Sequence, residues 1–327
     1  MILTGSIAAG LGHEQSDIDV MLITDQPGQV HELNYNRGGR RIDLLPFALK
    51  DFRRVIDLTS AFRATRQDRH QVMLDHVTAM RAARVATGEL LWADATAQAE
   101  LDRIDLVALA RMLMVRAAIE AATYTEDAVG CMAIGDWYTA LDAAQLALRK
   151  ACDSVLTAGQ DFYISDKFLF RRLARLPQAK SVFDDVWSLV QASPSPATDP
   201  KACAATVQNR LLLAGYLVGR ALLDGWTGDL PDLTYSPPSA EGPRRSPEFS
   251  LMRFADAIAL AGPNVGFEVS EPTARLWLAL NGRPRAAAIA DLAQMFGLDA
   301  EAGPTIGLAI DAMIGERAVD DLDGMAS

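Results

Sequence analysis

The chain has 327 residues, half of them hydrophobic, and a formal net charge of −11 at pH 7. This length favours two or three domains. The acidic balance argues against a protein that grips a nucleic-acid backbone, since such proteins concentrate Lys and Arg. No apolar run is long enough for a membrane span, and the N-terminus lacks the pattern of a secretory signal. Three cysteines without metal-like spacing are expected to be buried residues of a cytoplasmic protein.

The first fifty residues predict strands joined by turns. "DVMLIT" (19–24) is apolar and β-prone and leads into a turn signal at 25–28. "VHELNYN" (30–36) and "RRIDLLPF" (40–47) flank Gly38-Gly39, which predicts a hairpin. From Lys50 onward the apolar spacing becomes helical. Residues 1–95 are therefore predicted to form one α+β domain with a mixed sheet.

Residues 96–227 predict an α-helical bundle. Apolar residues recur at three- and four-residue spacing, and four or five helices fit this stretch. "QASPSPATDPKA" (191–202) predicts a loop, because prolines at this density cannot continue a helix. The last long helix is expected to end near Gly225.

The remainder predicts a linker followed by a small module. Residues 228–249 contain five prolines and little apolar material, as in an interdomain linker or an extended strap. Residues 250–327 predict two strands around 262–264 and then three short helices. This composition favours a winged-helix module.

The most informative residues are Asp17 and Asp19 in an apolar, strand-like run. Residues two apart in a strand face the same side, so both carboxylates are expected on one face. Adjacent carboxylates repel each other unless a cation lies between them, and Mg²⁺ prefers such oxygen ligands near phosphates. Asp43, in a neighbouring predicted strand, is expected to complete a three-carboxylate cluster that holds two ions.

Gly5-Ser6 predicts the complementary phosphate site. Glycine lets the backbone approach a phosphate, and the following N–H groups and hydroxyl can hold its oxygens. A phosphate turn and a metal cluster about ten residues apart suit in-line attack on a nucleoside triphosphate. The structural alternative makes Asp17 a helix cap and lets Asp43 close a turn.

This stretch resembles the signature of the DNA polymerase β-like nucleotidyltransferase superfamily. Gly5 and Ser6 match its phosphate-binding turn, Asp17 and Asp19 its metal pair, and Asp43 its third carboxylate. The resemblance implies a core followed by a helical domain that completes the nucleotide site, as in aminoglycoside nucleotidyltransferases. Two departures stand out. Ala9 occupies a position where many members have Arg, and only four residues precede Gly5 where a helix is usual, which is expected to weaken the edge of the core.

"QDFYISDKFLFRRLAR" (160–175) resembles a helical-domain segment of small-molecule nucleotidyltransferases in which a lysine meets the triphosphate. Lys167 is therefore a predicted nucleotide-binding residue, together with Gly5, Ser6 and Ser16. The alternative is an N-cap at Ser165 followed by a solvated cationic helix face.

The C-terminal module has five arginines against eleven acidic residues, which argues against DNA binding. It resembles the PqqD-like family, whose pattern has spaced Trp, Leu and Gly residues followed by an Ile-Ala helix. Trp277, Leu280 and Gly282 match the first part of this pattern, and Ile289 and Leu292 match the helix. That family recognises peptide leaders by adding them as an edge strand.

Together these features predict a magnesium-dependent nucleotidyltransferase that moves AMP from ATP to a peptide or small-molecule acceptor, with two Mg²⁺ ions. Asp17, Asp19 and Asp43 are the predicted catalytic and metal-binding residues. A peptide acceptor would place the protein in ribosomal-peptide tailoring. The alternatives are an aminoglycoside-type acceptor, or a non-catalytic peptide-binding or antitoxin-like protein with a degenerate core. Neither a membrane nor a nucleic acid is an expected partner.

Overall fold

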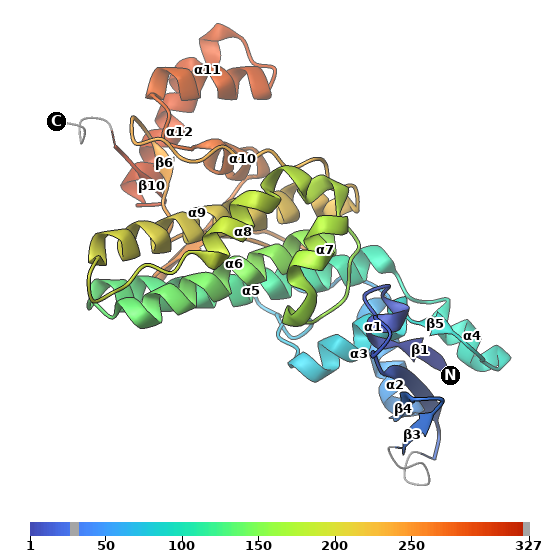
Figure 1. Cartoon of the computed structure of the whole chain (residues 1–327). Helices are drawn as coiled ribbons and strands as arrows, with labels where there is room; N and C mark the ends of the chain where they lie inside the picture. The colour runs from blue at the N-terminus through green and yellow to red at the C-terminus, as the bar shows by residue number, and fades with distance from the viewer. Residues whose placement is uncertain (27–32, 323–327) are drawn as a thin grey trace.

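The computed structural model describes residues 1–26 and 33–322. An N-terminal core and the C-terminal helices lie on opposite sides of a long helical bundle (Figure 1). Within the described ranges, every helix is too short or too polar to span a bilayer.

The core contains a five-stranded mixed sheet. Its strands are β1 (Ile2–Thr4), β2 (Ile18–Thr24), β3 (Leu33–Arg37), β4 (Arg40–Ala48) and β5 (Glu89–Leu90). They follow the order β3-β4-β2-β1-β5, in which β2 and β4 are parallel and all other neighbours antiparallel. The predicted α+β class with a mixed sheet is confirmed. β1 is an interior strand because β2 and β5 flank it.

The predicted hairpin around Gly38-Gly39 joins β3 to β4. Both glycines have positive φ angles, +61° and +77°, which a tight two-residue hairpin turn requires. Residues 27 and 28 of the predicted turn 25–28 lie outside the described residues, as do the first three residues of "VHELNYN" (30–32).

Three helices pack in the core: α1 (Gly5–Ala8), α2 (Leu49–Thr59) and α3 (His76–Thr87). The helical pattern predicted from Lys50 thus continues only to Thr59. The chain then turns around Gln71, whose side-chain amide donates to the carbonyls of Leu58 and Ala61 and accepts from the backbone of Arg63 and Ala64. These bonds satisfy loop groups that a longer helix would have paired internally.

The stretch predicted to be a helical bundle contains six α-helices among its described residues, where four or five were predicted. Its helices are α4 (Ala95–Leu101), α5 (Leu106–Ala133), α6 (Trp137–Ala158), α7 (Leu169–Arg175), α8 (Phe183–Gln191) and α9 (Pro200–Leu223). Short 3-10 helices intervene: η2 (Asp166–Phe168), η3 (Pro177–Val182) and η4 (Gly225–Thr227). One detail of the predicted loop 191–202 is wrong, because Pro200 opens α9. Proline is tolerated in a first helical turn, where its missing N–H has no partner to lose.

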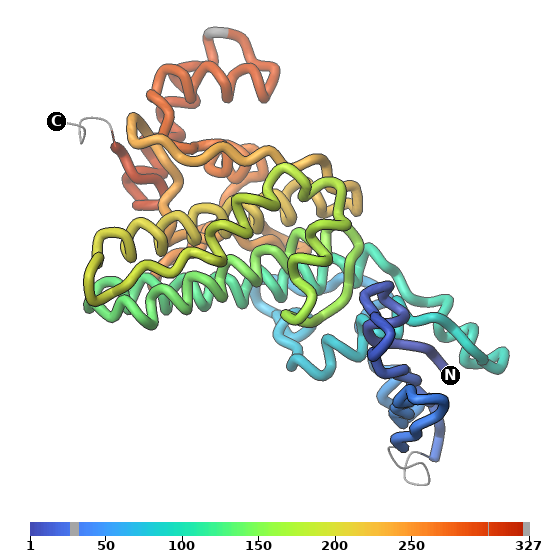
Figure 2. Tube along the Cα trace, in the orientation of Figure 1, coloured from blue at the N-terminus to red at the C-terminus, as the bar shows by residue number. Residues whose placement is uncertain are grey.

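The strap, residues 228–249, packs against the rest of the protein. Leu230, Leu233 and Phe249 are buried, and Arg244–Arg245 form strand β6, which pairs with β10 (Val319–Asp320). The trace of Figure 2 shows the strap running between α9 and the C-terminal helices. Of the two predicted alternatives, an interdomain linker or an extended strap, the strap therefore fits this stretch.

The C-terminal module has three strands before its helices, one more than predicted. β7 (Ser250–Arg253), β8 (Ile258–Gly262) and β9 (Val265–Val269) form an antiparallel sheet, because a turn divides the first predicted strand. α10 (Glu271–Ala279), α11 (Arg285–Met295), η5 (Ala300–Ala302) and α12 (Gly303–Gly315) follow, three α-helices as predicted. Trp277 is fully buried and donates to the carbonyl of Ala318 at 2.8 Å. The winged-helix class remains a prediction.

Candidate active site

The predicted phosphate turn lies where β1 meets α1. Gly5 has a φ of +74°, and a Cβ placed on it would lie 1.9 Å from Oδ2 of Asp19. Only glycine therefore allows the Asp19 carboxylate to pack against this turn. Thr4, paired with Asp19 across the sheet, is buried and donates its hydroxyl to the Asp19 carbonyl at 3.4 Å. The predicted phosphate turn and Asp19 thus pack directly against each other.

The three predicted carboxylates lie at the same end of the sheet. β2 begins at Ile18, so Asp17 stands just before the strand and is exposed, while Asp19 is half-buried. The parallel register puts Asp43 of β4 next to Asp19. Burial raises the pKa of Asp19, and the charges of Asp43 and Asp17 raise it further, against the opposing effect of Arg84. A bound cation would relieve this repulsion.

Asp43 makes an ion pair with Arg41, Nε to Oδ1 at 2.7 Å. In the part of the chain that the structure describes, no three His, Cys, Asp or Glu side chains are gathered into a metal site. The structure therefore brings Asp43 beside Asp19 in register, but the three-carboxylate metal cluster stays a prediction.

Ser16 organises the loop before Asp17. Its hydroxyl accepts from the backbone N–H of His13 at 2.9 Å, and its own N–H donates to the His13 carbonyl at 2.9 Å. The side chain is almost fully buried. Its observed contacts make it a loop-closing residue, and nucleotide contact by Ser16 stays a prediction.

Lys167 lies at the same cavity as the acidic pair, although about 150 residues separate them in the sequence. We call this cavity, of about 200 Å³, the acidic cavity. Its lining comprises Ser6, His13, Gln15, Ser16, Asp17, Asp19, Tyr163, Lys167 and Phe168. The Lys167 ammonium lies 5.1 Å from the Phe168 ring centre and makes no ion pair with any described residue. The helical domain therefore supplies a cation to the cavity that the two carboxylates line.

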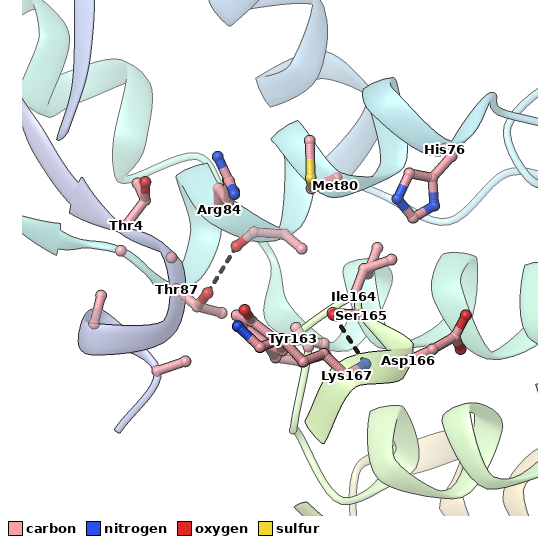
Figure 3. Close-up of a pocket in the computed structure, with 16 residues that line it drawn as sticks. Thr4, His76, Met80, Arg84, Thr87, Tyr163, Ile164, Ser165, Asp166 and Lys167 are labelled. Carbon is pink, nitrogen blue, oxygen red and sulfur yellow. Dashed lines mark hydrogen bonds between the residues drawn. The ribbon is translucent and has the colours of Figure 1, made fainter. Parts of the chain in front are cut away.

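A larger cavity of about 430 Å³ adjoins the acidic cavity and shares Tyr163 and Lys167 with it. Figure 3 shows α3 along one side of this α3 cavity, with His76, Met80, Arg84 and Thr87, and the segment 163–167 along the other. The Arg84 side chain forms no hydrogen bond or ion pair with the described residues.

Sequence reasoning missed Arg84 and gave Tyr163 no role. α3 carries two arginines, and nothing in the sequence separates Arg84, at the cavity, from Arg81, which lies over the Phe47 ring at 5.2 Å. Only the packing of α3 beside β1 decides which one faces the site. Tyr163 lies four positions before Lys167 in the segment 160–175, and this closeness in the sequence is the only signal that could have pointed to it.

Arginines of α7 fix the bundle to the segment that follows α1. Arg171 donates to the Leu11 carbonyl at 2.8 Å, and Arg175 donates to the Ala9 carbonyl at 2.7 Å. Asp161 holds both Arg175, at 2.7 Å, and Arg172, at 3.1 Å. These contacts set the position of Lys167 relative to Gly5.

The alternative predicted for the segment 160–175 is partly confirmed: Ser165 is the N-cap of η2, where its hydroxyl accepts from the backbone N–H of Lys167 at 3.2 Å. Arg171 and Arg175 are exposed on α7, but Arg172 is only 1% exposed, so the cationic face is only partly solvated.

One family model matches part of the core. Residues 1–67 match the family model described as nucleotidyltransferase domain. The match supports nucleotidyl transfer as the general activity. It contains the Gly5 turn and all three predicted carboxylates, whereas Arg84 and Lys167 lie outside it.

One solved structure is also similar, a nucleotidyltransferase-like protein from Exiguobacterium sibiricum. It is 13% identical, with a TM-score of 0.35, over 64% of this chain and 67% of that chain. No curated protein matches this sequence significantly.

Proposed function

We propose that this protein is a magnesium-dependent nucleotidyltransferase that moves a nucleoside monophosphate, AMP from ATP, to an acceptor and releases pyrophosphate. The observation that carries the proposal is the acidic cavity. Lys167 of the helical domain and Asp17 and Asp19 of the core line it together. A site for a metal-bound triphosphate needs carboxylates to hold the cation and a positively charged side chain to contact the phosphates.

The residues present fit a divalent cation. Asp17 and Asp19 are hard oxygen donors, and the raised pKa of Asp19 reflects burial and carboxylate repulsion that a cation would offset. Mg²⁺ would be held by these two residues with Asp43, and it would neutralise triphosphate charge and favour attack on the α-phosphorus. A site for a second ion is part of the same proposal.

The other groups bind and orient the nucleotide. Gly5 and Ser6 would receive the phosphates at the turn, with Ser16 closing the loop beside them. Arg84 on one side of the α3 cavity and Lys167 on the other would neutralise phosphate oxygens. The α3 cavity is within the size range of small-ligand pockets and is the proposed nucleoside site. Asp43, next to Asp19 in register, is the candidate to accept the proton of the acceptor.

A peptide is the proposed acceptor. β9 is an edge strand that pairs with β8 alone among the described strands, and Val265 at its start is 43% exposed. An edge strand offers free backbone donors and acceptors to an extended peptide. This observation supports the PqqD-like reading of residues 250–327.

The decisive test is nucleotidyl transfer by the full-length protein. Each of the four labelled nucleoside triphosphates would be incubated with Mg²⁺ and with candidate peptides or aminoglycosides, and labelled product and pyrophosphate would be measured. The double substitution Asp17→Ala and Asp19→Ala should abolish transfer. Asp25→Ala, an exposed carboxylate at the far end of β2, is the matched control and should leave it intact. Unchanged transfer in the double variant would refute the site assignment.

A further inference from the structure

A third cavity, of about 380 Å³, lies away from the acidic cavity, between α9, the strap and α10. Its lining contains three arginines, Arg220, Arg245 and Arg275, and one carboxylate, Asp224. We call it the arginine cavity. Such an excess of cationic side chains around a small concave space is typical of oxyanion recognition.

Arg245 is the most unusual group in this lining. It is 4% exposed, and its guanidinium donates to the carbonyls of Leu278, Leu280 and Leu212 at 2.9–3.3 Å. Its Nε is buried without a hydrogen-bond partner, and its charge has no carboxylate counterpart in the described structure. Burial lowers the pKa of Arg245 to about 10, so the group is still cationic at neutral pH. A buried cation without a counter-anion is costly, and a bound anion would offset that cost.

The other two arginines share a single carboxylate. Arg220 is ion-paired with Asp224, whose second oxygen accepts from Arg275 at 2.6 Å. Glu271 also pairs with Arg275, at 2.8 Å, but it is not part of the lining. The cavity wall therefore keeps a positive excess after these ion pairs are counted, because Arg245 has no carboxylate partner among the described residues.

The cavity also presents unused polar groups. Tyr235 and Asn281 line it, and neither the Tyr235 hydroxyl nor the Asn281 side-chain amide makes a hydrogen bond with a described residue. The Tyr216 hydroxyl, in contrast, is fully engaged with Thr234 and Arg220. The Tyr216 and Tyr235 rings lie 5.2 Å apart, so one wall is aromatic.

We propose that the arginine cavity binds a small organic anion, with its carboxylate or phosphate on Arg245 and Arg220 and its apolar part against Tyr235. Asn281 and the Tyr235 hydroxyl supply further donors. Because the cavity joins the bundle, the strap and α10, a bound anion would hold the C-terminal module against the bundle. This site is separate from the proposed nucleotide site.

The test is calorimetric titration of the full chain with phenyl phosphate and, separately, with phenylacetate at constant ionic strength. Benzyl alcohol is the neutral comparison. Saturable binding of either anion, without binding of the alcohol, is the expected result, and the anion that binds identifies the oxyanion class. Failure of both anions to bind would overturn the proposal.

Variants locate the binding. The pair Tyr235→Phe and Asn281→Ala should weaken it by about tenfold, the usual size for lost hydrogen bonds to a charged group. Tyr138→Phe, at a tyrosine that is 70% exposed on α6, is the control and should bind like the unaltered protein. Lys167→Ala should also retain binding, which separates this site from the acidic cavity. Binding that Lys167→Ala removes and the paired variant keeps would contradict the proposal.

Discussion

The cations of the helical bundle and those of the acidic and α3 cavities differ in what they contact. In the bundle, Arg172 pairs with Asp153 and Asp161, and Arg210 donates to the carbonyls of Leu189, Leu141 and Ala192. At the cavities, Lys167 and Arg84 make no hydrogen bond or ion pair through their side chains with any residue in the described ranges. Engaged cations hold the fold together, whereas cations that face a cavity without a partner are available to a ligand. This difference supports the proposed nucleotide site more directly than the sequence motif alone does.

The largest expected effect falls on the engaged cations. Arg172→Ala removes a buried cation from two carboxylates and, among the described residues, leaves Asp153 paired with only Lys150, at 4.0 Å, and Asp161 with only Arg175. The free energy of unfolding should therefore fall by about 3 kcal/mol. Urea unfolding measures this. Arg53→Ala, which removes a half-exposed ion pair with Glu100, should change it by less than about 1 kcal/mol. Equal losses in both variants would remove the distinction.

Substitutions at Gly5 and Gly38 distinguish the effect of backbone strain from that of a steric clash at the site. Gly5→Ala and Gly38→Ala both place a side chain at positive φ, which costs about 1–2 kcal/mol. The added Cβ meets Asp19 at Gly5 and nothing within 4 Å at Gly38. Both variants should lose stability in thermal unfolding, but only Gly5→Ala should also lose transfer activity. Full activity in Gly5→Ala would show that the Asp19 contact has no catalytic importance.

A substitution of Arg84 tests whether a cation without a hydrogen-bond or ion-pair partner in the described structure binds the ligand and does not stabilise the fold. Arg84→Ala should raise the KM for the nucleoside triphosphate by about tenfold, since one charged contact to phosphate is lost, and should leave the unfolding midpoint unchanged. Arg81→Ala on the same helix removes a cation that faces Phe47, and its KM should be unaltered. A destabilised Arg84→Ala with normal KM would place Arg84 among the structural arginines.

The smallest effect concerns the charge of Asp19. Its folded pKa is raised above the ordinary 3.8, so the folded state loses stability as the pH rises through the interval between these values. Asp19→Asn removes this loss. The variant should therefore unfold at a higher temperature than the unaltered protein at pH 7, and the difference should vanish below the ordinary pKa. A lower midpoint at pH 7 would contradict the repulsion described here.

The sequence predicted those parts of the site that are local. Gly5-Ser6 and Asp17-x-Asp19 lie within fifteen residues, and a turn and a strand fix their geometry. Asp43 required only one strand pairing, which the parallel β2–β4 register supplies. Arg84 depends on how α3 packs against a distant strand, and the burial of Arg172 depends on Asp153 and Asp161 reaching it. Neither dependence leaves a periodic pattern in the sequence, so sequence reasoning missed the first and misjudged the second.

The predicted secondary structure of the bundle rests on similarly local patterns. The bundle has strong helical periodicity, and Asp105, Asp136 and Asp199 accept from backbone N–H groups as N-caps of α5, α6 and α9. The prolines of 228–249 predicted extended chain, but not that Arg245 within it would be buried against α9 and α10. The hydrogen bonds of Arg245 go to backbone carbonyls. Because every residue has such a carbonyl, no sequence pattern marks these partners.

The most direct test of the central claim measures triphosphate binding and stability in Lys167→Ala. Calorimetric titration with a non-hydrolysable ATP analogue and Mg²⁺ should show affinity reduced about 10- to 100-fold, the range for a lost charge-assisted contact, with an unchanged unfolding midpoint. Lys180→Ala, an exposed lysine on η3, is the control and should bind normally. Undiminished binding in Lys167→Ala would contradict a nucleotide site shared by the core and the helical domain.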